Sequence, residues 1–299
     1  MFDKIAIFGV GLIGGSFALA LKEAGAVRHI AGVDRSAAFL QRAKALGIID
    51  AIAASAEDAV KNADLVLIAA PVAQTEAILR AIEPHLQAAT VVTDAGSTKS
   101  DVVVAARKAL GARIAQFVPG HPIAGRESNG PEAAIPDLFT GKKVVLAPLP
   151  ENSQEAVARV GEAWRQCGAI MHQLTPERHD RVFAAVSHLP HLLAYALVDN
   201  IAKKTHADLL FQYAASGFRD FTRIAGSSPE MWRDISLANR TALLDELDGY
   251  MVQLTQLRAS LAAADGTALE AVYANAQRAR HNWIRAIETA EKETKEGGD

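Results

Sequence analysis

One histidine, His121, stands between a glycine and a proline in the segment GHPIAGRESNG, residues 120–130. Glycine, proline and the Ser-Asn pair interrupt regular backbone hydrogen bonding, so the segment is predicted to be a loop, neither helix nor strand. A histidine held there with little backbone freedom is suited to accept a proton at neutral pH, as an alcohol oxidation requires when hydride leaves. The alternative is a solvated loop residue. The elements around the loop decide between these two interpretations.

Three glycines near the N-terminus have the spacing G-x-G-x-x-G of a dinucleotide-binding loop. Gly9, Gly11 and Gly14 follow the apolar run KIAIF and open a segment with helical spacing that begins at Leu12 and Ile13. In such a loop the first glycine permits a tight turn, the second lets a pyrophosphate approach, and the third permits close packing of helix on sheet. The free N–H groups of the helix start would bind the phosphates.

The acidic residue Asp34 indicates NAD as the cofactor. It ends a second apolar run, HIAGVD, about 20 residues beyond the last glycine of the loop, where a carboxylate binds the ribose hydroxyls. A carboxylate repels the 2′-phosphate of NADP, whereas the neighbouring Arg35 would attract it. We therefore expect NAD, and strict exclusion of NADP does not follow.

The first half of the chain alternates between apolar runs and segments with helical spacing. This alternation predicts a parallel sheet with helices on both faces. Ligands of such sheets bind at the carboxyl ends of the strands. Three stretches are predicted to lie there: Ala70-Pro71, Ser97, and His121 after a strand IAQFVP. For Ser97 a plain helix N-cap is equally plausible.

The pattern changes near Thr175. TPERHD has the N-cap threonine, the first-turn proline and the acidic residues of a helix start, and no convincing strand follows. The fold class is therefore α/β, with an N-terminal Rossmann-type doubly wound parallel sheet followed by an all-helical C-terminal domain. We assign residues 1–174 to NAD binding and residues 175–299 to dimerisation, and the resemblance described below implies that residues 175–299 also bind the substrate. The apolar surface of the predicted helices favours a homodimer.

The composition excludes several classes of partner. The 299 residues are 50% apolar, and their formal net charge of −3 is not basic enough for nucleic acid. No signal peptide is recognisable, and the longest uncharged run, 182–198, is short for a membrane span. The one cysteine, Cys167, is predicted to be a buried structural thiol. We therefore expect a cytoplasmic protein with a small-molecule substrate.

Five segments together resemble the prephenate/arogenate (cyclohexadienyl) dehydrogenases of tyrosine biosynthesis. They are GVGLIGGS (9–16), DAGSTKS (94–100), GHPIAGRESNG (120–130), SHLPH (187–191) and GFRDFTRIAGSSPEMW (217–232). The first occurs in many Rossmann proteins, and the last three are far more specific. The resemblance implies that prephenate loses hydride from its ring carbinol to NAD and loses its ring carboxylate as carbon dioxide, which gives 4-hydroxyphenylpyruvate.

The resemblance also implies roles for individual residues. His121 would accept the proton of the ring hydroxyl, and Ser97 would help to hold that hydroxyl and the nicotinamide. The substrate site is implied to comprise Ser187, His191, Arg223 and Gly217, with Glu127 and Asp220 arranging the pocket.

Residue chemistry agrees for Arg223, because prephenate is a dicarboxylate and a guanidinium is a planar, permanently charged partner for a carboxylate. The local alternative is a surface pair with Asp220, one helical turn away. His188 and His191 lie one turn apart on an apolar helix, but no nearby Cys, Asp or Glu completes a metal site. We expect no metal, and His188 is assigned either to packing or to a supporting position around the substrate site.

Other functions stay open on the sequence. Arogenate dehydrogenase is the nearest alternative. A β-hydroxyacid dehydrogenase would rely on a helix lysine, for which Lys203 and Lys204 are the adjacent candidates. An NADH-binding redox sensor would not need the loop around His121.

Overall fold

The computed structural model describes residues 1–126 and 128–296. The chain packs as two compact units, Met1–Leu243 and Leu244–Asp299. The boundary near residues 174 and 175 is where alternating strands and helices give way to helices, and it stays a prediction.

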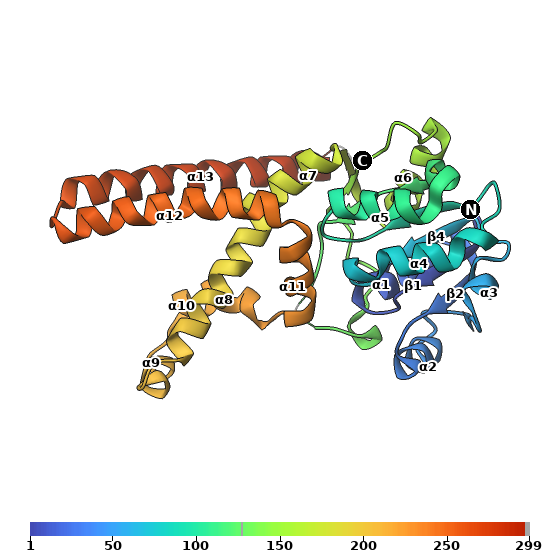
Figure 1. The fold of residues 1–299 in the computed structure, drawn as a ribbon, viewed down its shortest axis with the longest axis horizontal. Coiled ribbons are helices and arrows are strands. Elements are labelled where there is room, and N and C mark those ends of the chain that lie inside the picture. Colours follow the sequence, from blue (N-terminus) through green and yellow to red (C-terminus); the bar gives the residue numbers. More distant parts are fainter. Residues whose placement is uncertain (127, 297–299) are drawn as a thin grey trace. The chain divides into compact units, whose positions relative to one another are not determined.

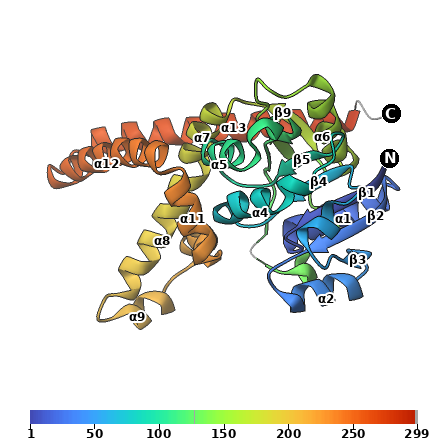
Figure 2. The ribbon, with the colours of Figure 1, turned by 45° about the vertical axis from the view of Figure 1, so that its right-hand side comes forward.

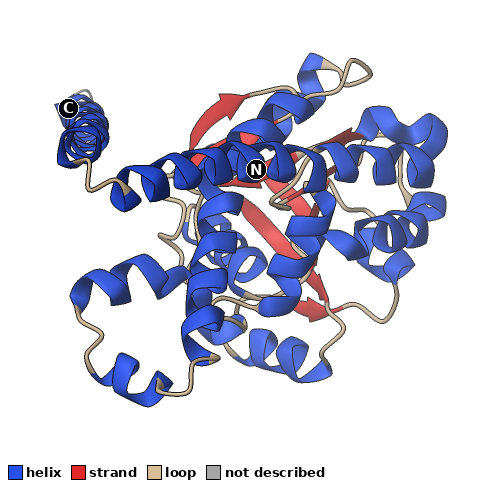
Figure 3. Ribbon diagram, turned by 60° about the vertical axis from the view of Figure 1, so that its left-hand side comes forward, coloured by secondary structure: helices blue, strands red, loops and turns tan. Residues whose placement is uncertain are grey.

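A six-stranded parallel sheet forms the centre of the first unit, with helices on both faces (Figure 3). Its strands are β1 (Phe2–Phe8), β2 (Val27–Val33), β3 (Ala51–Ile52), β4 (Leu65–Ile68), β5 (Val91–Asp94) and β6 (Phe117–Val118). The order β3-β2-β1-β4-β5-β6 confirms the predicted Rossmann-type sheet. The order reverses between β1 and β4, which is where such sheets bind dinucleotides.

Helices cover the sheet on both faces, and this is why the inner parts of its strands are mostly apolar. They are α1 (Leu12–Glu23), α2 (Ala37–Ala45), α3 (Ala56–Val60), α4 (Thr75–Ile82), α5 (Ser100–Leu110) and α6 (Gln154–Gln166). On β1, Ile5 and Ile7 enter one buried cluster, whereas Ala6 and Phe8 enter the other. Both faces of this part of the strand are therefore buried, as in other parallel sheets that are covered by helices on both sides.

A second, three-stranded sheet corrects the prediction for the segment around His121. Strand β7 (Gly120–Pro122) pairs antiparallel with β8 (Lys143–Leu146), which pairs parallel with β9 (Ile170–Gln173). The segment 120–122 is therefore an edge strand and not a loop, and edge strands tolerate proline because half of their N–H groups face outward. The expected strand IAQFVP is also shorter than predicted, because Gly111–Gln116 form a 3₁₀-helix.

From Thr175 onward the described chain is helical, as predicted. Thr175 caps the first helix by accepting a hydrogen bond from the Arg178 N–H. The helices are α7 (Pro176–Phe183), α8 (Leu189–Ala202), α9 (Ala207–Gln212), α10 (Ser216–Thr222), α11 (Pro229–Ala238), α12 (Arg240–Ala262) and α13 (Gly266–Glu296). A π-helical turn, Ala184–His188, joins α7 to α8 just before Pro190, whose ring nitrogen carries no hydrogen to donate.

Two parts of this helical region stand out in the ribbon. Helix α8 leads away from the sheet to α9 and α10 (Figures 1 and 2). In the second unit, α13 lies alongside α12 after a short turn (Figure 1).

One helical segment among the described residues, Pro176–Ala202, is long and apolar enough to cross a membrane by length and composition, and 28% of its apolar window is buried. Core helices of soluble proteins meet the same criterion. This segment contributes the buried polar side chains His179, Asp180 and His188.

Candidate active site

The glycine-rich loop joins β1 to α1 and leaves space for a ligand. Gly9 has a φ of +98°, and a Cβ there would lie 2.5 Å from the Ala69 carbonyl oxygen at the end of β4. A Cβ on Gly14 would lie 2.0 Å from the Gly9 carbonyl oxygen. A Cβ on Gly11 would meet no atom within 4 Å. Packing therefore requires two of the glycines, and the third leaves open space where a pyrophosphate would lie.

The N-terminus of α1 is suited to bind an anion. The helix begins at Leu12, Gly11 provides no side-chain cap, and the first turn holds no acidic residue. Leu12 and Ile13 pack partly against the core, so the first turn is held in place while its N–H groups lack a side-chain acceptor. These residues fit the phosphates of a dinucleotide.

Asp34 lies beside the same loop, directly after β2. Its carboxylate accepts hydrogen bonds from the N–H groups of Val10, at 3.0 Å, and Ser36, at 2.9 Å. The carboxylate is therefore at the edge of the glycine-rich loop, where ribose hydroxyls of a bound dinucleotide would lie. Arg35 is exposed next to it, and Ala70 and Pro71 are half-buried after β4 at the same edge of the sheet.

A buried ion pair ties together the segments that follow β5 and β6. The Lys99 ammonium contacts the Asp94 carboxylate and donates a hydrogen bond of 2.7 Å to the Gly120 carbonyl oxygen. The Gly120 N–H donates to the Asp94 carboxylate at 3.0 Å. Lys99 and Asp94 are almost completely buried. The pair therefore fixes Gly120, and with it His121, against the end of β5.

The His121 ring lies between the sheet and helix α7. Its Nδ1 is 2.8 Å from His179 Nε2, and its ring centroid is 4.9 Å from that of Phe183. Among the described residues this is the one side-chain hydrogen bond of His121, so its Nε2 is available to a ligand. Burial lowers the pKa of His121 well below its ordinary value, and unfavourable electrostatic interactions with His179 and Lys99 lower it further. His121 is therefore neutral at pH 7 and able to accept a proton.

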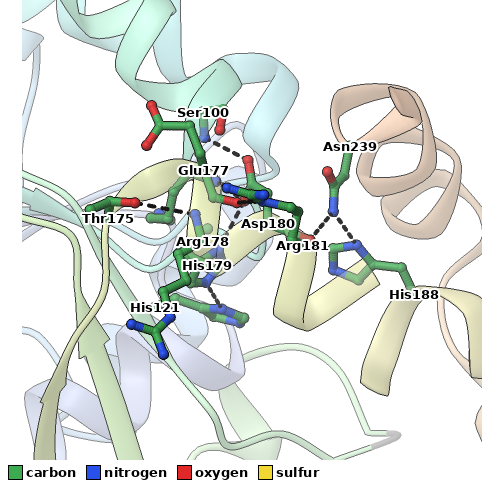
Figure 4. A network of polar contacts seen from close by, with 12 residues as sticks. Ser100, His121, Thr175, Glu177, Arg178, His179, Asp180, Arg181, His188 and Asn239 are labelled. Atoms are coloured by element: carbon green, nitrogen blue, oxygen red, sulfur yellow. Dashed lines mark hydrogen bonds and ion pairs between the residues drawn. The ribbon is translucent and has the colours of Figure 1, made fainter. Parts of the chain in front are cut away.

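Residues 179 and 180 are functional neighbours that the sequence interpretation missed. TPERHD was interpreted above as a helix start alone, yet its His179 contacts His121, and His179 Nδ1 lies 2.9 Å from Asp180 Oδ1 (Figure 4). The Asp180 carboxylate also accepts hydrogen bonds of 2.8 Å from the N–H groups of Lys99 and Ser100 at the start of α5. The adjacent His-Asp pair was the available signal, but no local pattern links it to position 121.

His188 is fully buried on the other side of Asp180. Asn239 uses its amide nitrogen to donate to the Asp180 carbonyl oxygen at 2.8 Å and to His188 Nδ1 at 3.0 Å (Figure 4). Burial lowers the pKa of His188 to about 4. His188 is thus a neutral residue that holds α7 and α11 together, in agreement with its predicted packing role.

His188 makes stability depend on pH. Its folded pKa of about 4 lies below the ordinary 6.5, so between these values the unfolded chain binds a proton that the folded chain does not. Stability contributed by this residue is therefore complete above pH 6.5 and falls with falling pH, by about 1.4 kcal/mol per pH unit and roughly 3 kcal/mol over the window. His188→Asn is expected to reduce the slope of unfolding free energy between pH 7 and pH 5, measured by urea unfolding. His206→Asn, which removes an exposed histidine, is the control. If wild type, His188→Asn and His206→Asn have equal slopes of unfolding free energy against pH, His188 is not the cause of the pH dependence.

Ser97 lies on a different element from Ser187 and His191. Ser97 follows β5 and is half-buried, and Ser187 lies in the π-helical turn. His191 Nδ1 lies 2.8 Å from the Ser187 carbonyl oxygen, and the ring stacks on Trp232 with centroids 3.5 Å apart. A carbonyl oxygen only accepts hydrogen bonds, so Nδ1 carries the hydrogen and Nε2 of the neutral ring is an acceptor. Burial, aided by the charge of Arg223, lowers the pKa of His191 and keeps the ring neutral at pH 7.

The remaining predicted substrate residues lie on or near α10. Arg223 is exposed at the end of this helix and close enough to His191 to lower its pKa. Asp220 and Gly217 are also exposed, and Asp220 lies 4.0 Å from Arg219. Glu127 lies outside the described residues. Among the described residues no group of three or more His, Cys, Asp or Glu side chains is arranged to hold a metal ion.

Comparison with known families covers almost the whole chain. Residues 17–173 match the model for the nucleotide-binding domain of prephenate dehydrogenase, and residues 175–275 match the model for its dimerization domain. The glycine-rich loop precedes the first match, so the evidence for it is the geometry above.

Individual relatives agree with these matches. The chain is 37% identical over 283 residues to a cyclohexadienyl dehydrogenase of Zymomonas mobilis, covering 94% of this chain and 96% of the relative. It is 39% identical to a prephenate dehydrogenase of Bacillus subtilis over 86% of this chain and 70% of that one. A crystal structure of prephenate dehydrogenase from A. aeolicus with hydroxyphenyl propionate and NAD+ has a TM-score of 0.84 and 37% identity, covering 91% of this chain and 95% of that one.

Proposed function

The chain belongs to the prephenate dehydrogenase family, and from this premise we propose that it converts prephenate to 4-hydroxyphenylpyruvate by NAD-dependent oxidative decarboxylation in tyrosine biosynthesis. The observation that supports this reaction is a neutral histidine, His121, fixed at the carboxyl edge of a sheet whose first loop fits a dinucleotide, with no hydrogen bond to its Nε2 from the described residues. NAD, when bound, accepts the hydride.

The protein's own contribution begins with binding. We propose that Gly9, Gly11 and Gly14 admit the pyrophosphate, and that Asp34 binds the adenosine ribose. Leu12, Ile13, Arg35, Ala70 and Pro71 complete the cofactor site. Ser97 lies between this site and His121 along the sheet edge, which supports a role in holding the ring hydroxyl and the nicotinamide.

His121 then moves one proton. Its Nε2 takes the proton of the ring hydroxyl as hydride leaves the carbon that bears this hydroxyl. The bond to the ring carboxylate breaks to release carbon dioxide, and its electron pair aromatises the ring. His121 can return the proton to the phenolic oxygen. The histidine is thereby regenerated and the atoms and charges balance.

We propose that Arg223 binds a substrate carboxylate, with Ser187, His191 and Gly217 beside it and Glu127 and Asp220 arranging the pocket. The proximity of Arg223 to His191 supports the first assignment. Gly217 and Asp220 are exposed, which leaves both positions accessible to a ligand.

Arogenate is a second candidate substrate, favoured by one specific feature. Arogenate carries an ammonium group where prephenate carries a keto oxygen. Neutral His191 presents an acceptor nitrogen, which suits an ammonium donor better than a keto oxygen. A relative 37% identical over 94% of this chain carries the name cyclohexadienyl dehydrogenase.

Steady-state NADH production with prephenate, and separately with arogenate, tests the proposal. Turnover of prephenate supports the main function, and comparable turnover of both indicates a dual-substrate enzyme. Failure to reduce NAD with either substrate would refute the proposed function and leave the redox-sensor alternative.

Cofactor preference depends on Asp34. Asp34→Ser should raise the KM for NAD and improve the relative use of NADP, because the repulsive carboxylate is removed and Arg35 can meet the 2′-phosphate. Kinetics with both cofactors measure this. Since the wild-type carboxylate also holds the Val10 N–H, Asp34→Asn is the control that keeps an acceptor there. Unchanged kinetics in Asp34→Ser would show that the ribose lies elsewhere.

We also propose a cytoplasmic homodimer that binds neither nucleic acid nor a membrane. A dimerization-domain model matches residues 175–275, and α9 and α10 expose several large apolar side chains. They are Leu209, Phe211, Tyr213 and Phe221. Light scattering at micromolar concentration measures the mass, and a single-chain mass would contradict the dimer. The net charge of −3 supports the absence of nucleic-acid binding, and the buried, unpaired Cys167 supports a cytoplasmic location.

A further inference from the structure

A line of three side chains joins the proton acceptor to the start of helix α5. His121 Nδ1 lies 2.8 Å from His179 Nε2, and His179 Nδ1 lies 2.9 Å from Asp180 Oδ1 (Figure 4). His179 is fully buried and Asp180 nearly so, and Phe183 packs against both imidazole rings. The three residues therefore form one shielded chain of hydrogen bonds.

Asp180 determines which atom donates and which accepts in each hydrogen bond among these three side chains. The Asp180 carboxylate accepts hydrogen bonds from the N–H groups of Lys99 and Ser100, each at 2.8 Å, at the positive end of the α5 dipole. Burial alone would raise the pKa of Asp180, but the hydrogen bonds from His179, Ser100 and Lys99 hold it below its ordinary value. Asp180 is therefore ionised and accepts hydrogen bonds only.

The position of the N–H hydrogen on each of the two imidazole rings then follows from the ionised Asp180. His179 Nδ1 faces an acceptor and must carry a hydrogen. Burial lowers the pKa of His179, so the ring is neutral at pH 7 and its Nε2 has no hydrogen. His121 Nδ1 must then donate to His179 Nε2, which leaves His121 Nε2 as a bare acceptor. The reverse direction would place the lone pair of His179 Nδ1 against a carboxylate oxygen 2.9 Å away.

We propose that His179 and Asp180 are positioning residues that lock His121 in the tautomer whose Nε2 can take the substrate proton. This inference rests on the proposed function for its catalytic consequence. When His121 accepts the proton, its Nδ1–H already donates to His179, and the Asp180 carboxylate lies behind that ring to offset the new positive charge. The proton leaves with the product oxygen, and the chain returns to its starting direction.

Titratable groups from other elements lie near these three side chains and do not change which atoms donate and which accept. Lys99 of α5 lies near both imidazoles, but its ammonium contacts the Asp94 carboxylate of β5. His188, from the π-helical turn, accepts from Asn239 and is neutral at pH 7. Among the described residues, Asp180 is thus the carboxylate that is hydrogen-bonded to this pair of rings, through His179 Nδ1.

Two substitutions at position 179 separate positioning from packing. His179→Phe keeps a ring of similar size but cannot accept a hydrogen bond, and we expect kcat to fall about a hundredfold, the usual effect of a misplaced catalytic group. His179→Gln offers an amide oxygen to His121 Nδ1 and should recover most of the activity. The Kd for NAD should change little in both. His188→Asn is the matched control, because it removes a buried histidine that is hydrogen-bonded to Asn239 and not to His121.

The tautomer is measured directly by ¹⁵N NMR of histidine-labelled protein at pH 7, with the His121 signal assigned by its loss in His121→Asn. We expect a protonated Nδ1 and a bare Nε2 in the wild type and in His179→Gln, and a protonated Nε2 in His179→Phe. A wild-type His121 with its hydrogen on Nε2 would overturn the inference. So would His179→Phe with wild-type kcat, or equal losses in Phe and Gln variants without a change of tautomer.

The NMR experiment needs no substrate, so it tests the inference even if no turnover is found. Wild-type protein that shows the expected tautomer but reduces NAD with neither prephenate nor arogenate would refute the proposed function alone. The wild-type spectrum also gives a result if His179→Phe does not fold.

Discussion

Replacing His121 by asparagine is expected to lower kcat by about a hundred- to ten-thousandfold, the usual contribution of a positioned base. Asparagine keeps a polar side chain of modest size but cannot take the hydroxyl proton. NAD binding should change little, because the proposed dinucleotide site consists of other residues, namely Gly9, Gly11, Gly14 and Asp34. Steady-state kinetics with prephenate and a titration with NAD measure the two effects.

The pH profile gives the same substitution a second readout. His121 works only when neutral, so turnover falls as pH drops through its pKa. The sequence predicts this fall in the ordinary histidine range, but burial lowers the pKa well below 6.5. The acid limb of the wild type should therefore lie at lower pH, and His121→Asn should lack it. Near-normal turnover with an intact acid limb would show that His121 is a bystander.

Replacing Arg223 by alanine is expected to raise the KM for prephenate about ten- to a hundredfold, which corresponds to the roughly 1.5–3 kcal/mol of a charge-assisted hydrogen bond. The KM for NAD should change much less, because the proposed partner of Arg223 is a substrate carboxylate. The neighbour Arg219 is the matched control, since it is an exposed arginine that pairs with Asp220 on the same short helix. Arg219→Ala should leave both constants close to wild type.

Circular dichroism distinguishes binding from folding in this pair of variants. Native spectra with a selective increase in the KM for prephenate support the substrate role of Arg223. An equal loss for both ligands, or a misfolded Arg223→Ala, would favour a structural role. Loss of the Arg223 charge should also raise the pKa of His191 toward its ordinary value.

The amino-acid sequence by itself determined the features that depend on neighbours in the chain. The glycine spacing 9-11-14, Asp34 after the second strand and the uninterrupted apolar runs predict the Rossmann-type sheet, which the strand order confirms. The helix start at Thr175 is confirmed by its capping hydrogen bond. These signals are readable because turns, caps and strand burial depend on residues only a few positions apart.

Tertiary structure decided how the base is held. His179 is 58 residues from His121 in the sequence. Asp180 is 81 residues from Lys99, whose N–H donates a hydrogen bond to the Asp180 carboxylate. Local sequence assigns His179 only to a helix start, and the short strand at 120–122 forms because β8 pairs with it. Such contacts arise when α7 packs on α5 and the end of β5, and no local pattern specifies that packing. The residue types thus indicated a base in this protein, and only the folded chain shows which nitrogen of His121 is hydrogen-bonded to His179.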